Sequence, residues 1–241
     1  MRHRLALPFA VLAGAVLALS NASGARAAEP EVLADRWELT QINGKPTGYA
    51  HTVVRRTGTA EAPLVETTIT THSEMVRGRD KVITDEVAVT TERPDGALVS
   101  SKTRKTEAGK ESVVEVTFTQ GEALIATTEL GQRREASAPV PAGTVGPWRA
   151  QQIPVEAGLK AGAKHEIPLY MNDFGGSVLA VATVAGQEEV ETLAGKQELV
   201  RVDVRLGPLP TMNTWVTPDG ATSVVRMEMM GMKIAILGSG M

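Results

Sequence analysis

The chain has 241 residues, with 25 lysines and arginines, 28 aspartates and glutamates, and no cysteine. This length fits one large domain or two small ones. The formal net charge of -3 argues against nucleic acid or an anionic membrane surface as a partner. The lack of cysteine excludes disulfides, thiolate metal sites, iron–sulfur clusters and a cysteine nucleophile. Aromatic residues make up only 3%, fewer than a chain that stacks sugars or bases usually carries.

Residues 1–27 have the pattern of a cleavable export signal. Residues 2–4 hold two arginines, residues 5–19 form an uncharged apolar run, and residues 25–27 have the small-x-small sequence of a cleavage site. The apolar run is shorter than the roughly 20 residues that cross a bilayer as a helix. We therefore expect Sec-type export to the periplasm or the exterior. We expect no transmembrane segment in the mature chain, residues 28–241.

The dominant pattern in the mature chain is an alternation with a period of two. Residues 31–41 fit either a short helix or a first strand. Farther along, residues 65–75, 114–119 and 200–206 alternate apolar side chains with polar or charged ones. Successive side chains of a strand point to opposite faces, so these runs predict strands that are buried on one side and wet on the other. The many threonines within them also suit an extended backbone.

Turn signals recur along the chain and divide it into roughly ten to twelve strands joined by short hairpins. Each of them contains glycine, which accepts the positive φ that tight hairpins need. They are Asn43-Gly44, residues 77–80, residues 94–96, Ala108-Gly109, Gln120-Gly121, Gly175-Gly176, Ala194-Gly195 and residues 218–220.

Helix is scarce and is confined to an irregular connector rich in proline and glycine, residues 139–162. Single helical turns are expected at residues 148–152 and 155–160, and Pro154 is expected to keep them apart. The connector separates strand sets at about residues 45–136 and 164–238. We predict an all-β fold: one domain whose long antiparallel strands form a curved sheet or an unclosed barrel, with one or two short helices.

Three histidines remain in the mature chain, and none has the spacing of a zinc-binding pair. Tyr49 and His51 share a strand face, and so do His72 and Glu74, which could act as an acid–base pair. An alternative reading is therefore a hydrolase-type enzyme built from His51, His72, His165 and nearby carboxylates. No serine-nucleophile elbow, phosphate loop or dinucleotide motif is present. We assign no catalytic residue, no cofactor and no metal.

The most unusual local feature is a methionine cluster near residue 230. Clustered thioethers bind Cu(I), so a copper site of Met227, Met229, Met230 and Met232 is a second alternative. Strand periodicity points Met227 and Met229 one way and Met230 the other. The three sulfurs converge only if the strand bulges at Gly231. Adaptable apolar packing, or the lining of a ligand cavity, is the favoured reading.

Five short stretches lie at residues 42–49, 93–98, 158–162, 191–196 and 215–220. They resemble the exported β-rich domain that precedes transglutaminase-like domains in bacteria. Each is mostly turn chemistry, and together they run through nearly all of the mature chain. This group is similar in architecture to the lipoprotein-carrier and lipoprotein-receptor fold, in which a curved antiparallel sheet forms an unclosed barrel around an apolar hollow. The resemblance implies an ancillary or ligand-holding domain without its own catalysis.

The sequence thus predicts an exported, non-catalytic module that holds an apolar ligand or a partner protein on a concave sheet face. The ligand would be a lipid or a lipoprotein acyl chain. Small or flexible apolar residues such as Ala180 and Ala182 stand where bulky aromatics would fill a wide core. The three tryptophans are isolated in sequence, so core or rim packing is their default role. The candidate ligand-binding residues are Tyr49, His51, Trp148, Trp215, Met227 and Met229.

Overall fold

The computed structural model describes residues 30–77 and 80–238, and these form one antiparallel sheet with one α-helix. The predicted export signal, residues 1–27, lies outside the described residues. The helices are α1 (Pro147–Glu156) and the short 3-10 helix η1 (Asn172–Phe174). The strands are β1 (Glu31–Ile42), β2 (Lys45–Gly58), β3 (Pro63–Arg77), β4 (Asp80–Glu92), β5 (Leu98–Glu107), β6 (Lys110–Thr119), β7 (Glu122–Glu129), β8 (Gln132–Pro139), β9 (Lys164–Met171), β10 (Gly176–Thr192), β11 (Gly195–Leu206), β12 (Met212–Val216), β13 (Thr222–Met229) and β14 (Met232–Gly238).

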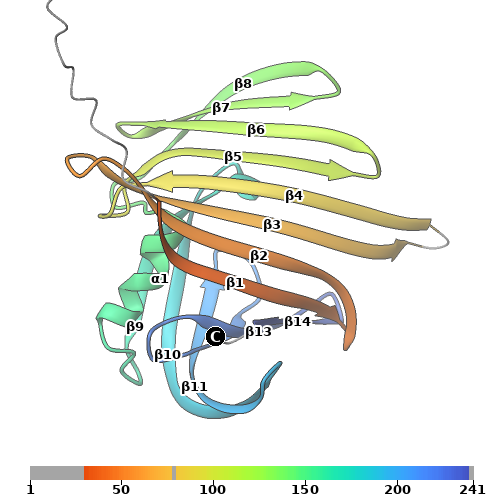
Figure 1. The fold of residues 1–241 in the computed structure, drawn as a ribbon, viewed down its shortest axis with the longest axis vertical. Coiled ribbons are helices and arrows are strands. Elements are labelled where there is room, and N and C mark those ends of the chain that lie inside the picture. The colour runs from red at the N-terminus through yellow and green to blue at the C-terminus, as the bar shows by residue number, and fades with distance from the viewer. Residues whose placement is uncertain (1–29, 78–79, 239–241) are drawn as a thin grey trace, which may run out of the picture.

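The strand order places the first and last strands side by side in the middle of the sheet. β1 pairs with both β2 and β14, so the order runs from β8 through β1 and β14 to β9. The two sheet edges are therefore β8 and β9, which α1 connects in the chain. Figure 1 shows the helix at this connection, beside the strands that follow it.

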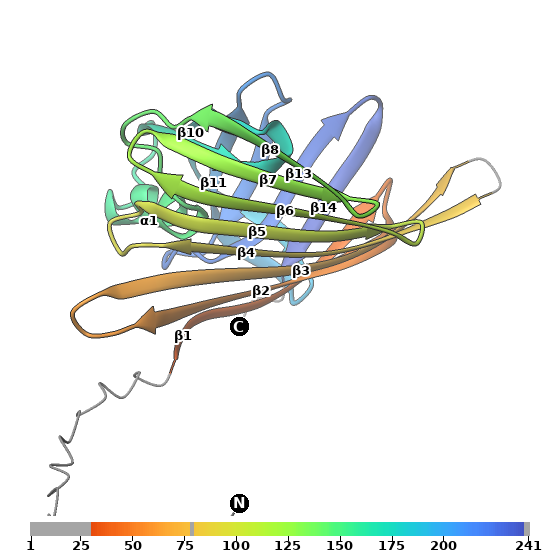
Figure 2. The same cartoon turned by 90° about the horizontal axis from the view of Figure 1, so that it is seen from above.

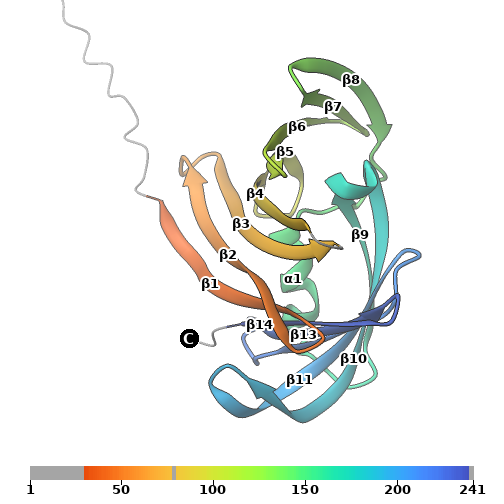
Figure 3. The same cartoon turned by 90° about the vertical axis from the view of Figure 1, so that its right-hand side faces the viewer.

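The sheet curls so that one face becomes concave, with α1 inside the curve (Figure 3). Seen from above, β3 to β8 form one wall, and β13 and β14 lie behind them (Figure 2). Several apolar side chains of the concave face stay half-buried, among them Val114, Ile125, Ile234 and Ile236. Side chains alone therefore do not fill the curve.

A β-bulge in β10 gives the sheet a buried cluster on each face. The pairing of β10 with β11 shifts by one residue between Val184 and Gly186, and a one-residue shift turns the following side chains to the opposite face. Before the bulge, Ala182 and Val184 pack with Val202 on the concave side. Beyond it, Val190 packs with Leu199, Trp215 and Val224 on the convex side.

The predicted all-β class and the curved antiparallel sheet are confirmed. The expected ten to twelve strands are too few, because the described residues form a sheet of 14 strands. Of the two alternatives for residues 31–41, the first strand is correct, since they belong to β1. The prediction that Pro154 separates two helical turns is wrong, since α1 runs through this proline and ends at Glu156. The proline stands in the last turn, so only two helical residues follow it. None of the helices within the described ranges is long and apolar enough to cross a membrane.

Candidate functional site

An apolar cavity of about 270 Å³ lies between α1 and the concave face of β9 to β12. We call it the α1 cavity. From the helix and the turn after it come Pro147, Ala150, Gln151, Pro154, Val155 and Leu159. From the sheet and the turn between β12 and β13 come Ile167, Leu169, Ala180, Ala182, Val202, Val204, Val216 and Gly220.

The local sequence explains why the α1 cavity is apolar and why it stays open. The helix residues that line it recur at intervals of three and four, so they form one face of α1. On β10 and β11 the lining residues are every second residue, as expected for one face of a strand. Ala180 and Ala182 are buried but short, so the sheet beneath the helix leaves space that larger side chains would fill.

Gln151, in the lining of the α1 cavity, is hydrogen-bonded to an arginine that is not itself part of the lining. Arg36 on β1 donates from Nη1 to the Oε1 of Gln151 on α1, at 3.3 Å. The Arg36 Nε is buried and has no hydrogen-bond partner. Gln151 is the single cavity-lining residue with a polar side chain. The contact therefore brings a guanidinium to the side of an otherwise apolar space.

The N-terminus of α1 is held by a buried carboxyl group from the sheet. The Glu92 side chain, which is 0% exposed, accepts hydrogen bonds from the backbone N–H groups of Trp148 at 3.2 Å and Arg149 at 2.8 Å. These donors have no partner within the helix, and Gly146 provides no side-chain cap. Burial raises the pKa of Glu92 to about 7, against the opposing effect of the two N–H donors and of the Arg149 charge.

Glycine at position 146 is required by the same contact. A Cβ atom there would overlap the carboxylate of Glu92. The backbone N–H of Gly146 also donates to the carbonyl oxygen of Gly96, in the turn that follows β4, at 3.0 Å. The helix is thereby fixed to the β4–β5 hairpin at its first residues.

A row of aromatic rings crosses the convex face on β1, β2 and β3. The rings of Trp37 and His51 stack at 4.1 Å, and those of Tyr49 and His72 stack at 5.3 Å. Trp37 is 51% exposed and Tyr49 is 43% exposed. Stacked rings cover each other's faces, so this row presents ring edges to solvent rather than a flat apolar surface. Its clear contribution is to cross-strand pairing.

The two histidines of this row each contact a carboxylate. The Nε2 of His51 lies 2.7 Å from Asp35, and the Nδ1 of His72 lies 2.7 Å from Asp85. The hydrogen bond that the imidazole donates to Asp85, with a smaller effect of Glu74, raises the pKa of His72. Both pairs are partly open to solvent.

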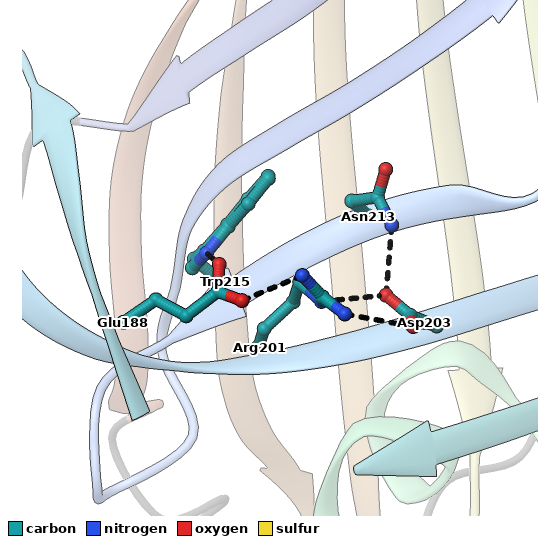
Figure 4. A network of polar contacts seen from close by, with 5 residues as sticks. All are labelled: Glu188, Arg201, Asp203, Asn213 and Trp215. Carbon is teal, nitrogen blue, oxygen red and sulfur yellow. Dashed lines mark hydrogen bonds and ion pairs between the residues drawn. The ribbon is translucent and has the colours of Figure 1, made fainter. Parts of the chain in front are cut away.

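A polar network closes the buried cluster on the convex side (Figure 4). Glu188 accepts a hydrogen bond from Arg201 at 2.5 Å and another from the indole N–H of Trp215 at 3.2 Å. Arg201 also pairs with Asp203, which accepts a hydrogen bond from Asn213 at 2.7 Å. Because each member has a partner and Trp215 is only 7% exposed, the network has a structural role.

The sequence matches one protein family over most of its length. A family described as "Protein of unknown function (DUF3108)" matches residues 36–239, most of the chain. The chain belongs to the DUF3108 family. None of the curated proteins compared with it matches.

A solved structure supports the fold of this DUF3108 chain. It is the beta-barrel-like protein of a domain of unknown function, DUF1849, from Brucella abortus. The two chains are 15% identical, with a TM-score of 0.56, and the match covers 86% of this chain and 97% of the other. At this identity the likeness concerns the fold alone. The resemblance to the lipoprotein-carrier fold stays a prediction.

The six candidate ligand-binding residues of the DUF3108 chain do not come together, and none of them lines the α1 cavity. Tyr49, His51 and Trp215 lie on the convex side. Trp148 lies on α1 and contacts Glu92 through its backbone. By register, Met227 and Met229 share the concave face with half-buried Ile234 and Met232.

The methionine cluster is arranged differently from the strand-based expectation. Met229 pairs directly with Met232 across the β13–β14 hairpin, and Met227 lies two residues away on the same face. Three thioethers therefore share one face without a bulge. Met230 occupies the turn at φ 52° and is fully exposed.

The three histidines do not assemble into one site. His51 and His72 lie on the convex face, whereas His165 pairs with Ala182 on the concave face of β9. Within residues 30–77 and 80–238, no group of three or more histidine or carboxylate residues is placed to hold a metal ion. Sequence reasoning singled out Ala180 and Ala182, which do line the α1 cavity, but missed Gln151 and Arg36. The only sequence signal for Arg36 is a charged residue within an alternating strand. The only one for Gln151 is a glutamine on the apolar side of a helix.

Proposed function

We propose that this protein is an exported, non-catalytic binding module that holds an apolar ligand chain in the α1 cavity. The observation that carries the proposal is the cavity itself: an apolar space of about 270 Å³ between a helix and the concave side of a curved sheet. Concave, mostly apolar spaces with few polar groups are the usual form of small-ligand sites.

The size of the cavity sets the size of the ligand. An engineered apolar cavity of about 150 Å³ holds benzene, and a water molecule takes about 30 Å³ of liquid. The α1 cavity therefore suits a chain of roughly eight or nine methylene-sized groups. At about 0.8 kcal/mol per buried methylene, eight groups give about 6 kcal/mol before the cost of association. This favours weak to moderate binding of one acyl or alkyl chain.

Export is supported by the sequence of residues 1–27. The mature protein is then expected in the periplasm or outside the cell. The mass of the protein isolated from a periplasmic fraction tests this step. A mature chain beginning near Ala28 supports export, and uncleaved protein in the cytosol contradicts it.

Calorimetric titration with decan-1-ol tests the binding function. We expect the wild type to bind it and Ala182→Phe, which fills the space beneath α1, to lose at least about tenfold in affinity. Ala126→Phe, on the convex face, is the matched control and should bind as the wild type does. Failure of decan-1-ol to bind, or equal binding by a folded Ala182→Phe variant, would refute the proposal.

A further inference from the structure

We propose that the ligand of the α1 cavity is an amphiphile with an anionic head, and that Arg36 is the residue that binds this head. The inference rests on the proposed function and adds the chemical class of the ligand. The relevant chemistry is an oxygen-rich anion, carboxylate or phosphate, at the end of an apolar chain.

The first observation is the contact of Arg36 with the cavity lining, which it reaches through Gln151 without being part of the lining itself. Its hydrogen bond at 3.3 Å ends on Gln151, a residue of the helix face that lines the cavity. The guanidinium thus lies next to a space that is otherwise apolar. An anion bound at Arg36 would direct the chain attached to it along the apolar face of α1.

The unused hydrogen-bonding capacity of Arg36 is the second step. A guanidinium has five N–H donors, and the contact with Gln151 uses one of them. The Nε is buried without a partner, which is costly for a charged group away from water. A carboxylate or phosphate would satisfy two parallel donors at once, which is the strongest geometry available to arginine.

The third observation is that Arg36 lacks a direct ion pair among the described residues. Within the described residues, Arg36 forms no ion pair with a carboxylate, whereas four other arginines do. These four are Arg56, Arg133, Arg149 and Arg201.

Glu38 is the acidic group that faces Arg36 from the same strand. Both side chains lie on the concave face, two residues apart on β1, and no ion pair joins them. Burial raises the pKa of Glu38, and the Arg36 charge opposes this effect. Burial thus disfavours the Glu38 carboxylate, which would compete with a bound anion for Arg36.

The test compares ligands that share one chain and differ only in the head. Decan-1-ol, decanoate, decyl phosphate and decylammonium are titrated calorimetrically into the full chain, below their micelle concentrations. We expect decanoate or decyl phosphate to bind at least about tenfold more tightly than decan-1-ol, as one charge-assisted contact implies. Decylammonium should bind no better than decan-1-ol. The tighter of the two anions identifies the head as a carboxylate or a phosphate.

Variants of Arg36 assign the effect to this residue. Arg36→Met keeps the apolar stem and removes the charge, so this variant should bind the anions no more tightly than it binds decan-1-ol. Arg36→Lys should restore part of the preference. Arg104→Met removes an exposed arginine from the convex face and is the matched control.

The outcomes separate this inference from the proposed function. If decan-1-ol binds and the anions bind no better, the inference is wrong and the apolar-ligand function stands. If Arg36→Met weakens decan-1-ol and decanoate equally, Arg36 only positions α1, and the inference is again wrong. If no probe binds, both proposals fail.

Discussion

The buried carboxyl of Glu92 gives a sharp prediction for stability against pH. In the unfolded chain its pKa is near 4.5, and burial raises the folded-state value to about 7. Below about pH 4.5 the group is protonated in both states and burial has no ionisation cost. As the pH rises toward 7, the unfolded chain releases its proton while the folded protein keeps it, so the free energy of unfolding falls.

The magnitude follows from the difference between the two pKa values of Glu92. At about 1.4 kcal/mol per pH unit, a difference of about 2.5 lowers the free energy of unfolding by about 3 kcal/mol between acid and neutral pH. The loss is complete above about pH 7, where both states are ionised. Glu92→Gln cannot titrate, so this part of the pH dependence is absent from the variant.

Urea unfolding of the wild type and Glu92→Gln between about pH 4 and about pH 8 measures the effect directly. The stability of the variant relative to the wild type should rise by about 3 kcal/mol over this range. Glu111→Gln, at an exposed position on β6, is the control and should follow the wild type at every pH. A constant difference between the wild type and Glu92→Gln would refute the reasoning.

Three further predictions concern the helix anchor, the convex network and the histidine row. Gly146→Ala should lower the free energy of unfolding by about 2 kcal/mol, because the added methyl group overlaps Glu92. Gly176→Ala is the control and should change stability little, since no atom lies near its added methyl group. Equal losses of stability by the two variants in thermal melts would contradict this prediction. Glu188→Ala should lower the free energy of unfolding by about 1–3 kcal/mol in urea, because it removes the acceptor of the Trp215 indole N–H and one of the two carboxylate partners of Arg201. The control Glu189→Ala, at an exposed position, should lower the free energy of unfolding by less than about 1 kcal/mol. A larger loss for Glu189→Ala than for Glu188→Ala would count against a structural network. Asp85→Asn should lower the pKa of His72 in an NMR titration, and an unchanged value would exclude the hydrogen bond as the cause.

The fold class could be predicted because a half-buried strand has a period of two that survives without tertiary information. The predicted number of strands was too low where a hydrophobic residue occupies the turn of a hairpin. Leu130 and Met230 adopt positive φ values of 49° and 52° ahead of glycines in tight turns. Their side chains give no turn signal, so β7 and β8, and likewise β13 and β14, were hard to separate.

The candidate site was much less predictable, because its parts are far apart in the sequence. Arg36 and Gln151 are 115 residues apart, and Glu92 lies 56 residues from Trp148. Local patterns carry no information on such pairs. The face of each aromatic residue also depended on pairing register, and the bulge at Gly186 reverses the face along β10.

Central pairing of β1 with β14 has a consequence for how the chain becomes folded. The backbone N–H of Lys233 donates to the Asn43 side chain across 190 residues of sequence. If the chain emerges from an export channel amino end first, β1 exposes unpaired backbone on one side until the last strand has arrived. Closing so long a loop is slow. If the chain is exported in this way, this interval is the period of greatest risk of aggregation, and the one in which a chaperone is of most use.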